Sequence, residues 1–399
     1  MLIKRDFYIE KLKIFLDKPV IKVITGMRRV GKSTILLSLM EELKQNLDEK
    51  NIIYINKESL EFDFIQNYES LYKYIKSLLP NNREKKYVII DEIQEILHWE
   101  KAILSIYTEK LADIIITGSN AHLLSSEIAT LISGRYIEFQ IYPLTFSEFL
   151  TFRGNNTSSK EDEFQKFIKF GGLPGIHLFN NDMAILDYLN SIINTLLLKD
   201  VVKRNNIRDV RLLEKIAQYL ADNCGNITTA KSISDYFKSQ KIKVSFDTVN
   251  NYISYLVSAF LFYRIQRFEI KGKKYLEFFD KIYLGDVGLR NGFIGYRDKD
   301  ISGILENIVL LELKKRGYKV SVGVQNGFEI DFIAENQNGK IYFQVCRSLA
   351  EEQTIKREFG NLQKIDDNYK KIVLSLDKFF PEDYNGIEHQ YLLDFLLQK

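Results

Sequence analysis

Short runs of β-branched and other apolar residues alternate with helical stretches over the first 145 residues. Five of these runs predict strands, at 20–25, 52–55, 87–90, 114–117 and 136–141. The first four are nearly all apolar, which is typical of strands that helices cover on both faces. Strands that alternate with helices indicate a parallel sheet. The pattern therefore predicts a three-layer α/β domain.

The rest of the chain shows two further patterns. Apolar residues recur at helical spacing between 183 and 261, and a mixture of strands and helices follows. Residues 262–268 and 275–283 predict two strands joined by a basic turn at 271–274. The stretch 153–163 has no large apolar residue and predicts a boundary. We expect an α/β domain, a helical connector, a helical module and a mixed α/β domain over 1–152, 153–207, 208–285 and 286–399.

Composition narrows the class of protein. The 399 residues include 56 Lys and Arg and 53 Asp and Glu, a formal net charge of +3. This small net charge predicts no strong nonspecific binding to nucleic acid or to an anionic membrane. Two cysteines, Cys224 and Cys346, are too few for a disulfide framework or a four-cysteine metal site. No apolar run approaches the roughly 18 residues of a membrane span, and charges interrupt the first residues. We expect a cytoplasmic protein without membrane contact.

The four histidines occur singly, without the spacing of metal ligands, so we propose no zinc site. They are His98, His122, His177 and His389.

Residues 26–34 match the pattern Gly-x-x-x-x-Gly-Lys-Ser/Thr between a predicted strand and a helical stretch. Glycines let the backbone turn so that successive amides face a phosphate at the positive end of the helix. In this arrangement Lys32 reaches the β- and γ-phosphates, and Ser33 offers a hydroxyl to Mg²⁺. The residues expected to hold the nucleotide are Gly26, Arg28, Arg29, Val30, Gly31, Lys32, Ser33 and Thr34.

A second apolar strand, at 87–90, delivers Asp91 and Glu92 at its carboxyl end. Ligands of such sheets bind at that edge. We expect Asp91 to hold Mg²⁺ and Glu92 to polarise the attacking water. The pair is a weak signal alone, but it becomes specific when it follows Lys32 with one strand between them.

The candidate catalytic residues are Lys32, Glu92, Asn120 and Arg135. Ser119 or Asn120, after the strand at 114–117, could place a polar group beside the γ-phosphate, or could cap a helix. Arg135 could touch a γ-phosphate in cis or from a neighbouring subunit, or form a surface salt bridge. Of Arg28 and Arg29, one could face phosphate and the other an acidic partner, and the sequence leaves this open.

These tracts resemble the prokaryotic AAA+-type ATPases that carry a C-terminal domain of unknown function. The resemblance implies a P-loop NTPase fold that binds ATP and Mg²⁺, with Lys32, Ser33, Asp91 and Glu92 in the roles above. It covers essentially the whole chain, in the segments 24–34, 90–94, 117–120, 131–135, 143–149, 171–174, 199–202, 252–265 and 283–288.

The predicted helices 209–223, 229–239 and 245–260, followed by strand, turn and strand, have the order of a winged helix-turn-helix. The expected exposed positions of the third helix, Asp247, Asn250, Asn251 and Ser254, include no Lys or Arg. Because phosphate contact needs positive charge, protein docking and DNA binding stay equal alternatives. The positive charge lies on Lys238, Lys241, Lys243, Lys271, Lys273 and Lys274.

The last segment resembles the restriction-endonuclease-like fold, whose pattern is a helical Glu, a strand Asp and then Glu-x-Lys. Glu306 and Asp331 fit the first two positions, but Gln344 and Cys346 replace the last two. Without the second carboxylate and the lysine, metal binding and water activation should fail. We expect the fold without nuclease turnover.

The leading hypothesis is a slow ATPase that acts as a conformational switch and engages a protein or DNA partner through its C-terminal modules. The alternatives are an ATP-coupled DNA-processing nuclease and a DNA-binding regulator. Arg135 also makes a homo-oligomer with shared sites an expectation to test.

Overall fold

The computed structural model describes residues 3–121, 132, 134–154, 158–276, 279–297 and 301–398. The chain divides into two compact units. Unit 1 is Met1–Ile141 with Ser258–Phe260, and unit 2 is Tyr142–Val257 with Leu261–Lys399. Among the described residues, the longest apolar helical stretches fall short of what a bilayer crossing requires.

Unit 1 is built on a five-stranded parallel sheet in the order β2-β3-β4-β1-β5. This confirms the predicted parallel α/β sheet. β1 and β3 are buried along their whole length, as strands between two helical layers should be. The strands are β1 (Ile21–Thr25), β2 (Ile52–Asn56), β3 (Tyr87–Asp91), β4 (Asp113–Gly118) and β5 (Tyr136–Gln140).

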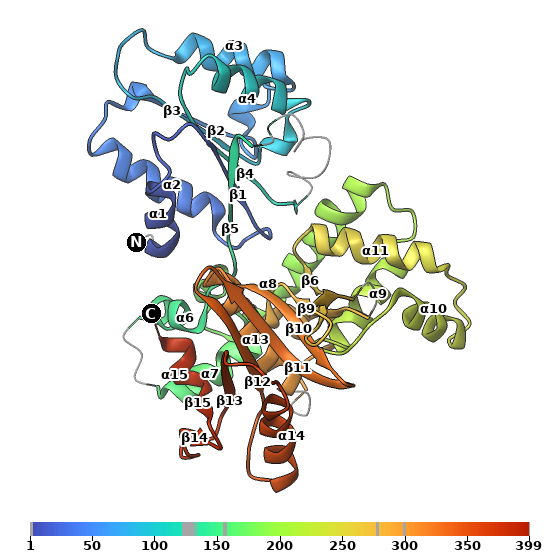
Figure 1. Ribbon diagram of the computed structural model, residues 1–399. Helices are drawn as coiled ribbons and strands as arrows, with labels where there is room; N and C mark the ends of the chain where they lie inside the picture. Colours follow the sequence, from blue (N-terminus) through green and yellow to red (C-terminus); the bar gives the residue numbers. More distant parts are fainter. Residues whose placement is uncertain are drawn as a thin grey trace. The chain divides into compact units, whose positions relative to one another are not determined.

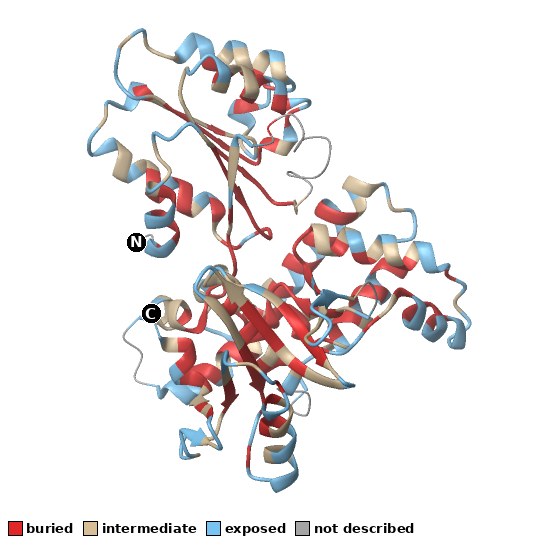
Figure 2. Ribbon diagram, in the orientation of Figure 1, coloured by how far each residue is buried: buried red, intermediate tan, exposed pale blue. Residues whose placement is uncertain are grey.

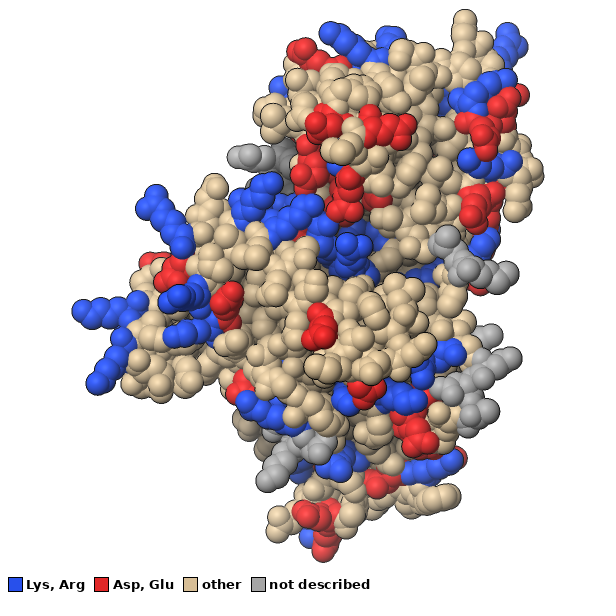
Figure 3. Space-filling model, turned by 180° about the vertical axis from the view of Figure 1, so that it is seen from behind, with Lys and Arg blue, Asp and Glu red and all other residues tan. Residues whose placement is uncertain are grey.

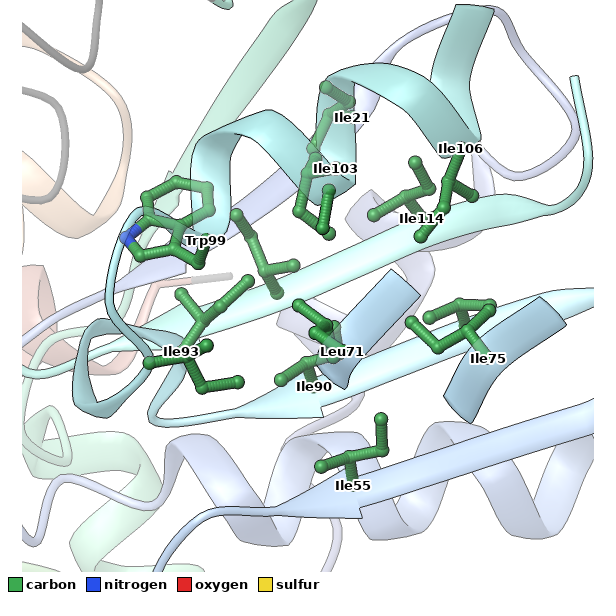
Figure 4. Close-up of a cluster of buried hydrophobic side chains, with 14 of the residues drawn as sticks. Ile21, Ile55, Leu71, Ile75, Ile90, Ile93, Trp99, Ile103, Ile106 and Ile114 are labelled. Atoms are coloured by element: carbon green, nitrogen blue, oxygen red, sulfur yellow. The ribbon is translucent and has the colours of Figure 1, made fainter. Parts of the chain in front are cut away.

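Helices cover the two faces of this sheet (Figure 1). The side chains of Leu71 and Ile75 on α3, and of Ile103 and Ile106 on α4, pack against sheet isoleucines in one dry cluster (Figure 4). Burying each such side chain contributes about 1.5–3 kcal/mol. The helices are α1 (Asp6–Lys13), α2 (Lys32–Lys44), α3 (Tyr68–Leu78) and α4 (Trp99–Thr108), with the 3-10 turns η1 (Glu49–Asn51), η2 (Leu60–Phe62) and η3 (Ile93–Glu95).

The strand order decides where the functional groups meet. β4 lies between β1 and β3, and all three run in the same direction. The loop after β1, the carboxylates after β3 and the polar residues after β4 therefore share one edge of the sheet.

Unit 2 begins with helices. The three central helices agree with the predicted ranges 209–223, 229–239 and 245–260 to within two residues. The elements are α6 (Phe146–Arg153), α7 (Lys160–Phe170), η5 (Pro174–Leu178), α8 (Asp182–Thr195), the π-helix η6 (Leu196–Lys203), α9 (Val210–Asp222), α10 (Ala230–Ser239) and α11 (Phe246–Ser258).

The remainder of unit 2 holds an eight-stranded mixed sheet, in the order β14-β15-β13-β12-β11-β10-β7-β8, and the separate pair β6-β9. Its helices are α12 (Val287–Ile294), α13 (Ile301–Lys315), α14 (Glu352–Gln363) and α15 (Leu392–Leu397). Its strands are β6 (Phe262–Ile265), β7 (Arg267–Glu269), β8 (Lys274–Tyr275), β9 (Lys281–Leu284), β10 (Lys319–Gln325), β11 (Phe328–Asn336), β12 (Gly339–Val345), β13 (Lys370–Ser375), β14 (Asp383–Tyr384) and β15 (Ile387–Tyr391).

The single long hairpin predicted over 262–283 forms two separate pairings. β6 pairs with β9, whereas β7 and β8 pair with each other and β7 lies parallel to β10. The amide of Val322 on β10 donates to the carbonyl of Gln266, just before β7, at 2.9 Å. Pairing with β7 thus satisfies backbone amides and carbonyls that β10 would otherwise expose as an edge strand. The basic turn therefore belongs to the edge of the large sheet.

Candidate functional site

The loop between β1 and α2 is folded tightly. Gly26 has φ 142° and Gly31 has φ 98°, and a Cβ added at Gly26 would lie 2.4 Å from the carbonyl oxygen of Ile141. The loop delivers the chain to the first turn of α2, whose amides have no acceptor within the helix. Such amides at the positive end of a helix form an anion site, so the loop fits a phosphate group.

The side chain of Lys32 folds back over this loop. Its ammonium donates to the carbonyl oxygens of Gly26 at 3.0 Å and Met27 at 3.3 Å, and it lies 3.6 Å from Oε1 of Glu92. Lys32 is 4% exposed. The structure therefore brings the predicted lysine and the predicted carboxylate together at the sheet edge.

The two arginines of the loop have different surroundings. Arg28 is buried and its Nη1 donates to Oε1 of Glu58 at 2.7 Å. Arg29 is exposed and has φ 70°. Arg28 is thus the loop arginine for which the structure shows an acidic partner.

One residue that supports the loop was missed by the sequence analysis. Nη1 of Arg5, just before α1, donates to the carbonyl oxygen of Val30 at 3.1 Å, and Arg5 is buried beside the ring of Tyr8. No motif marks an arginine so far from the loop, so only the fold reveals this contact.

Asp91 and Glu92 are joined by a hydroxyl from the neighbouring strand. Oγ1 of Thr117, on β4, donates to Oδ1 of Asp91 and accepts from the amide of Glu92 at 3.0 Å. Thr117 belongs to the tract that carried the family resemblance, but we assigned it no role. Its place near the end of the strand between β1 and β3 is the signal that could have found it.

The pKa values of the two carboxyls move in opposite directions. Burial raises the pKa of Asp91, and hydrogen bonds from Ser33 and Thr117 oppose this only in part. Burial also acts to raise the pKa of Glu92, but Lys32, with a hydrogen bond from Gln94, outweighs it and lowers that pKa. Glu92 is therefore held as a carboxylate near neutral pH.

The donor set suits a magnesium ion. The Ser33 hydroxyl and the Asp91 carboxylate are hydrogen-bonded neighbours, and Mg²⁺ prefers such oxygen ligands. Among the described residues, no three His, Cys, Asp or Glu side chains are grouped to hold a metal by themselves. A magnesium ion here would therefore take its remaining oxygen ligands from water or from a nucleotide.

Glu92 also carries backbone strain. It has φ 55° and ψ 51° directly after β3, a left-handed conformation that is uncommon outside glycine. Residues held in this way cluster at functional sites.

Two of the other predicted site residues, Ser119 and Asn120, lie at the same edge of the sheet as the phosphate loop. Ser119 and Asn120 are buried just beyond β4, on the same edge as Asp91, and Ser119 helps to lower the pKa of Glu92. Whether Ser119 or Asn120 caps a helix stays a prediction, because residues 122–131, with His122, lie outside the described residues.

Arg135 lies at the amino end of β5. Its carbonyl oxygen accepts from the amide of Ile21 at 2.7 Å, and Ile21 pairs with Tyr136. The phosphate loop starts at the other end of β1, about 16 Å away at 3.3 Å per residue. Arg135 therefore occupies the edge of the parallel sheet opposite the phosphate loop, which leaves a contact from a neighbouring subunit and a surface salt bridge as the alternatives for this residue.

Unit 2 contains a second cluster, around Glu306. Lys281 on β9, which the sequence analysis missed, places its ammonium 3.2 Å from Oε2 of Glu306 and 2.7 Å from Oε1 of Glu329. The hydroxyl of Tyr283 donates to Glu306 at 2.8 Å. Burial opposes the charge of Lys281, but these carboxylates and Asp331 raise its pKa.

Asp331 and Gln344 are tied into the same cluster. Oδ2 of Asp331 accepts from the amide of Val345 at 2.8 Å, and Oε1 of Gln344 accepts from the amide of Asp331 at 2.7 Å. Nε2 of Gln344 donates to Glu358 at 2.9 Å. Burial raises the pKa of the Cys346 thiol, which suits an inert core residue.

Comparisons with known proteins agree with this geometry. A family profile described as AAA domain matches residues 18–150, and one described as Domain of unknown function (DUF8612) matches residues 161–300. The Walker-type ATPase of Pyrococcus abyssi superposes with a TM-score of 0.52 at 17% identity, covering 73% of this chain and 96% of that chain. Residues 18–150 thus match an AAA domain, and the fold is that of a P-loop ATPase.

Two relatives extend the match over the chain. An uncharacterized protein of Haemophilus influenzae is 37% identical, covering 100% of this chain and 99% of its own. An uncharacterized protein of Methanocaldococcus jannaschii is 30% identical, covering 95% of this chain and 86% of its own. The chain therefore belongs to the same family as these two proteins.

Proposed function

We propose that this protein binds ATP with Mg²⁺ at the loop 26–34, hydrolyses it slowly, and uses the nucleotide state to change how unit 2 engages a protein or DNA partner. One observation carries the proposal. The ammonium of Lys32 lies 3.6 Å from Glu92, beside a glycine loop that ends on a helix N-terminus. The Lys32 cation, the proposed base Glu92 and the anion site of the loop thus lie together at the carboxyl edge of the unit 1 sheet.

Each side chain has a role in this proposal. The loop amides and Lys32 hold the phosphates, Ser33 and Asp91 hold the magnesium ion, and Glu92 orients and polarises the attacking water. Bound Mg²⁺ would supply neutralisation of the charge that develops on the phosphoryl oxygens. Asn120 beyond β4 would place a polar group beside the γ-phosphate, and Thr117 holds Asp91 and the amide of Glu92 in place.

The pairing of Glu92 supports slow turnover. In this structure the carboxylate is engaged by Lys32 and by Nε2 of Gln94. Glu92 can act as a base only after the Lys32 ammonium leaves it and binds a phosphate. This change of partner limits the rate of basal hydrolysis.

The experiment compares two variants that separate binding from chemistry. We expect Lys32→Ala to weaken binding of a fluorescent ATP analogue by tenfold or more, because the phosphates lose their buried cation. We expect Glu92→Gln to keep binding but to lower phosphate release by about 10²–10⁴-fold, the usual contribution of a general base. Lys44→Ala, at the far end of α2, is the control. Unchanged binding and hydrolysis in Lys32→Ala would end the proposal.

The partner half of the proposal rests on unit 2. We assign α9, α10, α11 and the β6-β9 pair to a winged-helix-like module over 208–285. Exposed lysines project from the lobe at the left of Figure 3, whereas Asp247, Asn251 and Ser254 are the exposed polar positions of α11. A helix without basic residues favours protein docking over reading of DNA bases. The lysines of this lobe are Lys231, Lys238, Lys241 and Lys243.

We assign 286–399 to a degenerate restriction-endonuclease-like domain without nuclease turnover. The ion pairs of Lys281 with Glu306 and Glu329 support this, because they occupy the carboxylate that a metal would need. β7 pairs with β10 across the proposed boundary at 285, so the module and the last domain share one sheet. We retain 1–152 as the range of the first domain and 153–207 as that of the connector, whereas the compact unit 1 ends at Ile141 and α6 belongs to unit 2.

Arg135 supports a further part of the proposal. Because it lies at the sheet edge opposite its own phosphate loop, we assign it to the nucleotide of a neighbouring subunit in a homo-oligomer. Specific ATPase activity that rises with protein concentration in the wild type, but not in Arg135→Ala, would support this assignment. A concentration-independent rate in the wild type would reject it.

A further inference from the structure

One face of the large sheet in unit 2 is only partly covered. α14 packs on β11, β12 and β13, and the core there includes Phe359 and Leu362. Burial decreases from the middle of the sheet toward the turn between β11 and β12 (Figure 2). The open part of this face carries the residues that we call the lysine–aromatic strip, which are Phe268, Tyr275, Lys319, Lys340 and Tyr369.

The strip alternates rings with cations. The ammonium of Lys319 lies 4.7 Å from the ring centre of Tyr275, and that of Lys340 lies 5.1 Å from Phe268 and 5.7 Å from Tyr369. The rings of Phe268 and Tyr275 meet edge to face at 5.1 Å. Tyr275 is 37% exposed and Tyr369 is 49% exposed, so both offer ring surface to solvent.

Strand pairing explains why these side chains share one face. Phe268 is opposite Tyr275, and Glu335 is opposite both Lys319 and Lys340. Paired residues of neighbouring strands point to the same side of a sheet. The arrangement is therefore built by the register of five strands, β7, β8, β10, β11 and β12.

The charge around the strip is positive. The exposed turn between β7 and β8 adds Lys271 and Lys273, and Lys274 follows as the first residue of β8, where it pairs with Glu269. Two carboxylates oppose this charge, since Glu335 pairs with Lys340 at 2.9 Å and Asp367 accepts from the amide of Tyr369 at 3.2 Å. The cations exceed the carboxylates, although the chain as a whole is nearly neutral.

We propose that the lysine–aromatic strip binds single-stranded nucleic acid. Exposed rings between cations are what an unpaired strand requires, because bases stack on the rings while the phosphates contact the lysines. A duplex hides its base faces and would gain only from the charges. The strip deepens the partner part of the proposed function, but it needs no bound nucleotide.

The test measures binding of a fluorescein-labelled oligo(dT) of about 20 nucleotides to the full chain by anisotropy at several salt concentrations. We expect the full chain to bind it more tightly than a hairpin duplex of equal length. Tyr275→Ala and Tyr369→Ala should each weaken binding by about tenfold, whereas Tyr275→Phe should retain it, because the base loses a stacking surface only in the alanine variants. Replacing Lys271, Lys273 and Lys274 by Gln should lower the slope of log affinity against log salt by about two.

Matched controls separate the possible failures. Replacing Lys238, Lys241 and Lys243 by Gln removes the same charge from the helical module and should change the affinity by less than about twofold. Lys32→Ala should bind oligo(dT) like the wild type, so loss of the ATP site and loss of the strip are distinguishable. Equal losses in the two lysine triples, no effect of Tyr275→Ala, or preference for the duplex would each overturn the proposal.

Discussion

Lys32 in unit 1 and Lys281 in unit 2 are both buried beside carboxylates, yet their surroundings differ. Lys32 donates to two backbone carbonyls and reaches Glu92 only at 3.6 Å. Lys281 lies between Glu306 at 3.2 Å and Glu329 at 2.7 Å. The first cation can exchange its carbonyl contacts for a phosphate, whereas the second already neutralises two carboxylates.

The backbone around each lysine explains the difference. Lys32 begins a helix that follows a glycine loop, so unsatisfied amides face the same space as its ammonium. Lys281 is on a buried strand, and Tyr283 two residues later faces the same Glu306. A lysine and carboxylates therefore indicate a ligand site only when the backbone beside them also has unsatisfied groups.

The largest effect that we expect from this comparison is on stability. Lys281→Met should lower the free energy of unfolding by about 3–5 kcal/mol, because removing one partner of a buried ion pair leaves charges without compensation. Lys32→Met should lower it by less, since one carboxylate at a longer distance is affected. Denaturant unfolding of both variants checks the difference.

A double variant tests the cause. Lys281→Met combined with Glu306→Gln removes both charges and should recover part of the lost stability. If Lys281→Met were as stable as Lys32→Met, the assignment of Lys281 to a structural role would be wrong.

The pH dependence of stability should also distinguish Asp331 in unit 2 from Glu92 in unit 1. Burial, with Glu306 nearby, raises the pKa of Asp331 well above 3.8. The protonated carboxyl of Asp331 therefore contributes its full stability below pH 3.8, and this contribution is lost as the pH rises through the raised pKa. The stability of Asp331→Asn, relative to the wild type, should rise between about pH 5 and pH 8.

Glu92 should behave in the opposite way. Its pKa is lowered from 4.5 despite burial, so its contribution is present above 4.5 and is lost as the pH falls through the lowered value. The stability difference between Glu92→Gln and the wild type should therefore be flat between about pH 5 and pH 8. Denaturant midpoints at three pH values measure both variants, and parallel profiles would contradict the contrast.

The sequence predicted the parts of the fold that depend on local pattern. The apolar strands of unit 1 lie within one or two residues of their predicted ranges, because burial on both faces leaves a continuous apolar run. The hairpin over 262–283 failed because pairing of β7 with β10 is a contact between segments distant in sequence. Hydrophobic pattern alone does not encode which sheet an edge strand joins.

The candidate site shows the same division. Lys32 and Asp91 follow from a motif and from a strand end, and the structure places them at one edge. Thr117 and Arg5 act through contacts that only the strand order and the packing of α1 create. Arg135 was predicted from its place in the chain, and strand direction puts it at the edge opposite the phosphate loop.

The smallest effect that we expect concerns Arg5, which holds the phosphate loop from outside the motif. Arg5→Ala removes the hydrogen bond to the Val30 carbonyl, and a bond from a charged donor contributes about 1.5–3 kcal/mol. Only part of this free energy affects the ATP-binding conformation of the loop, and the rest lowers the overall stability of the protein. We therefore expect ATP affinity to fall by tenfold or less. The turnover rate at saturating ATP should stay unchanged, because Glu92 and Asp91 keep their Thr117 contacts. Titration with the ATP analogue measures the affinity, and phosphate release measures the turnover rate. A lower turnover rate at saturating ATP with normal affinity would show that Arg5 acts on the chemistry rather than on the loop.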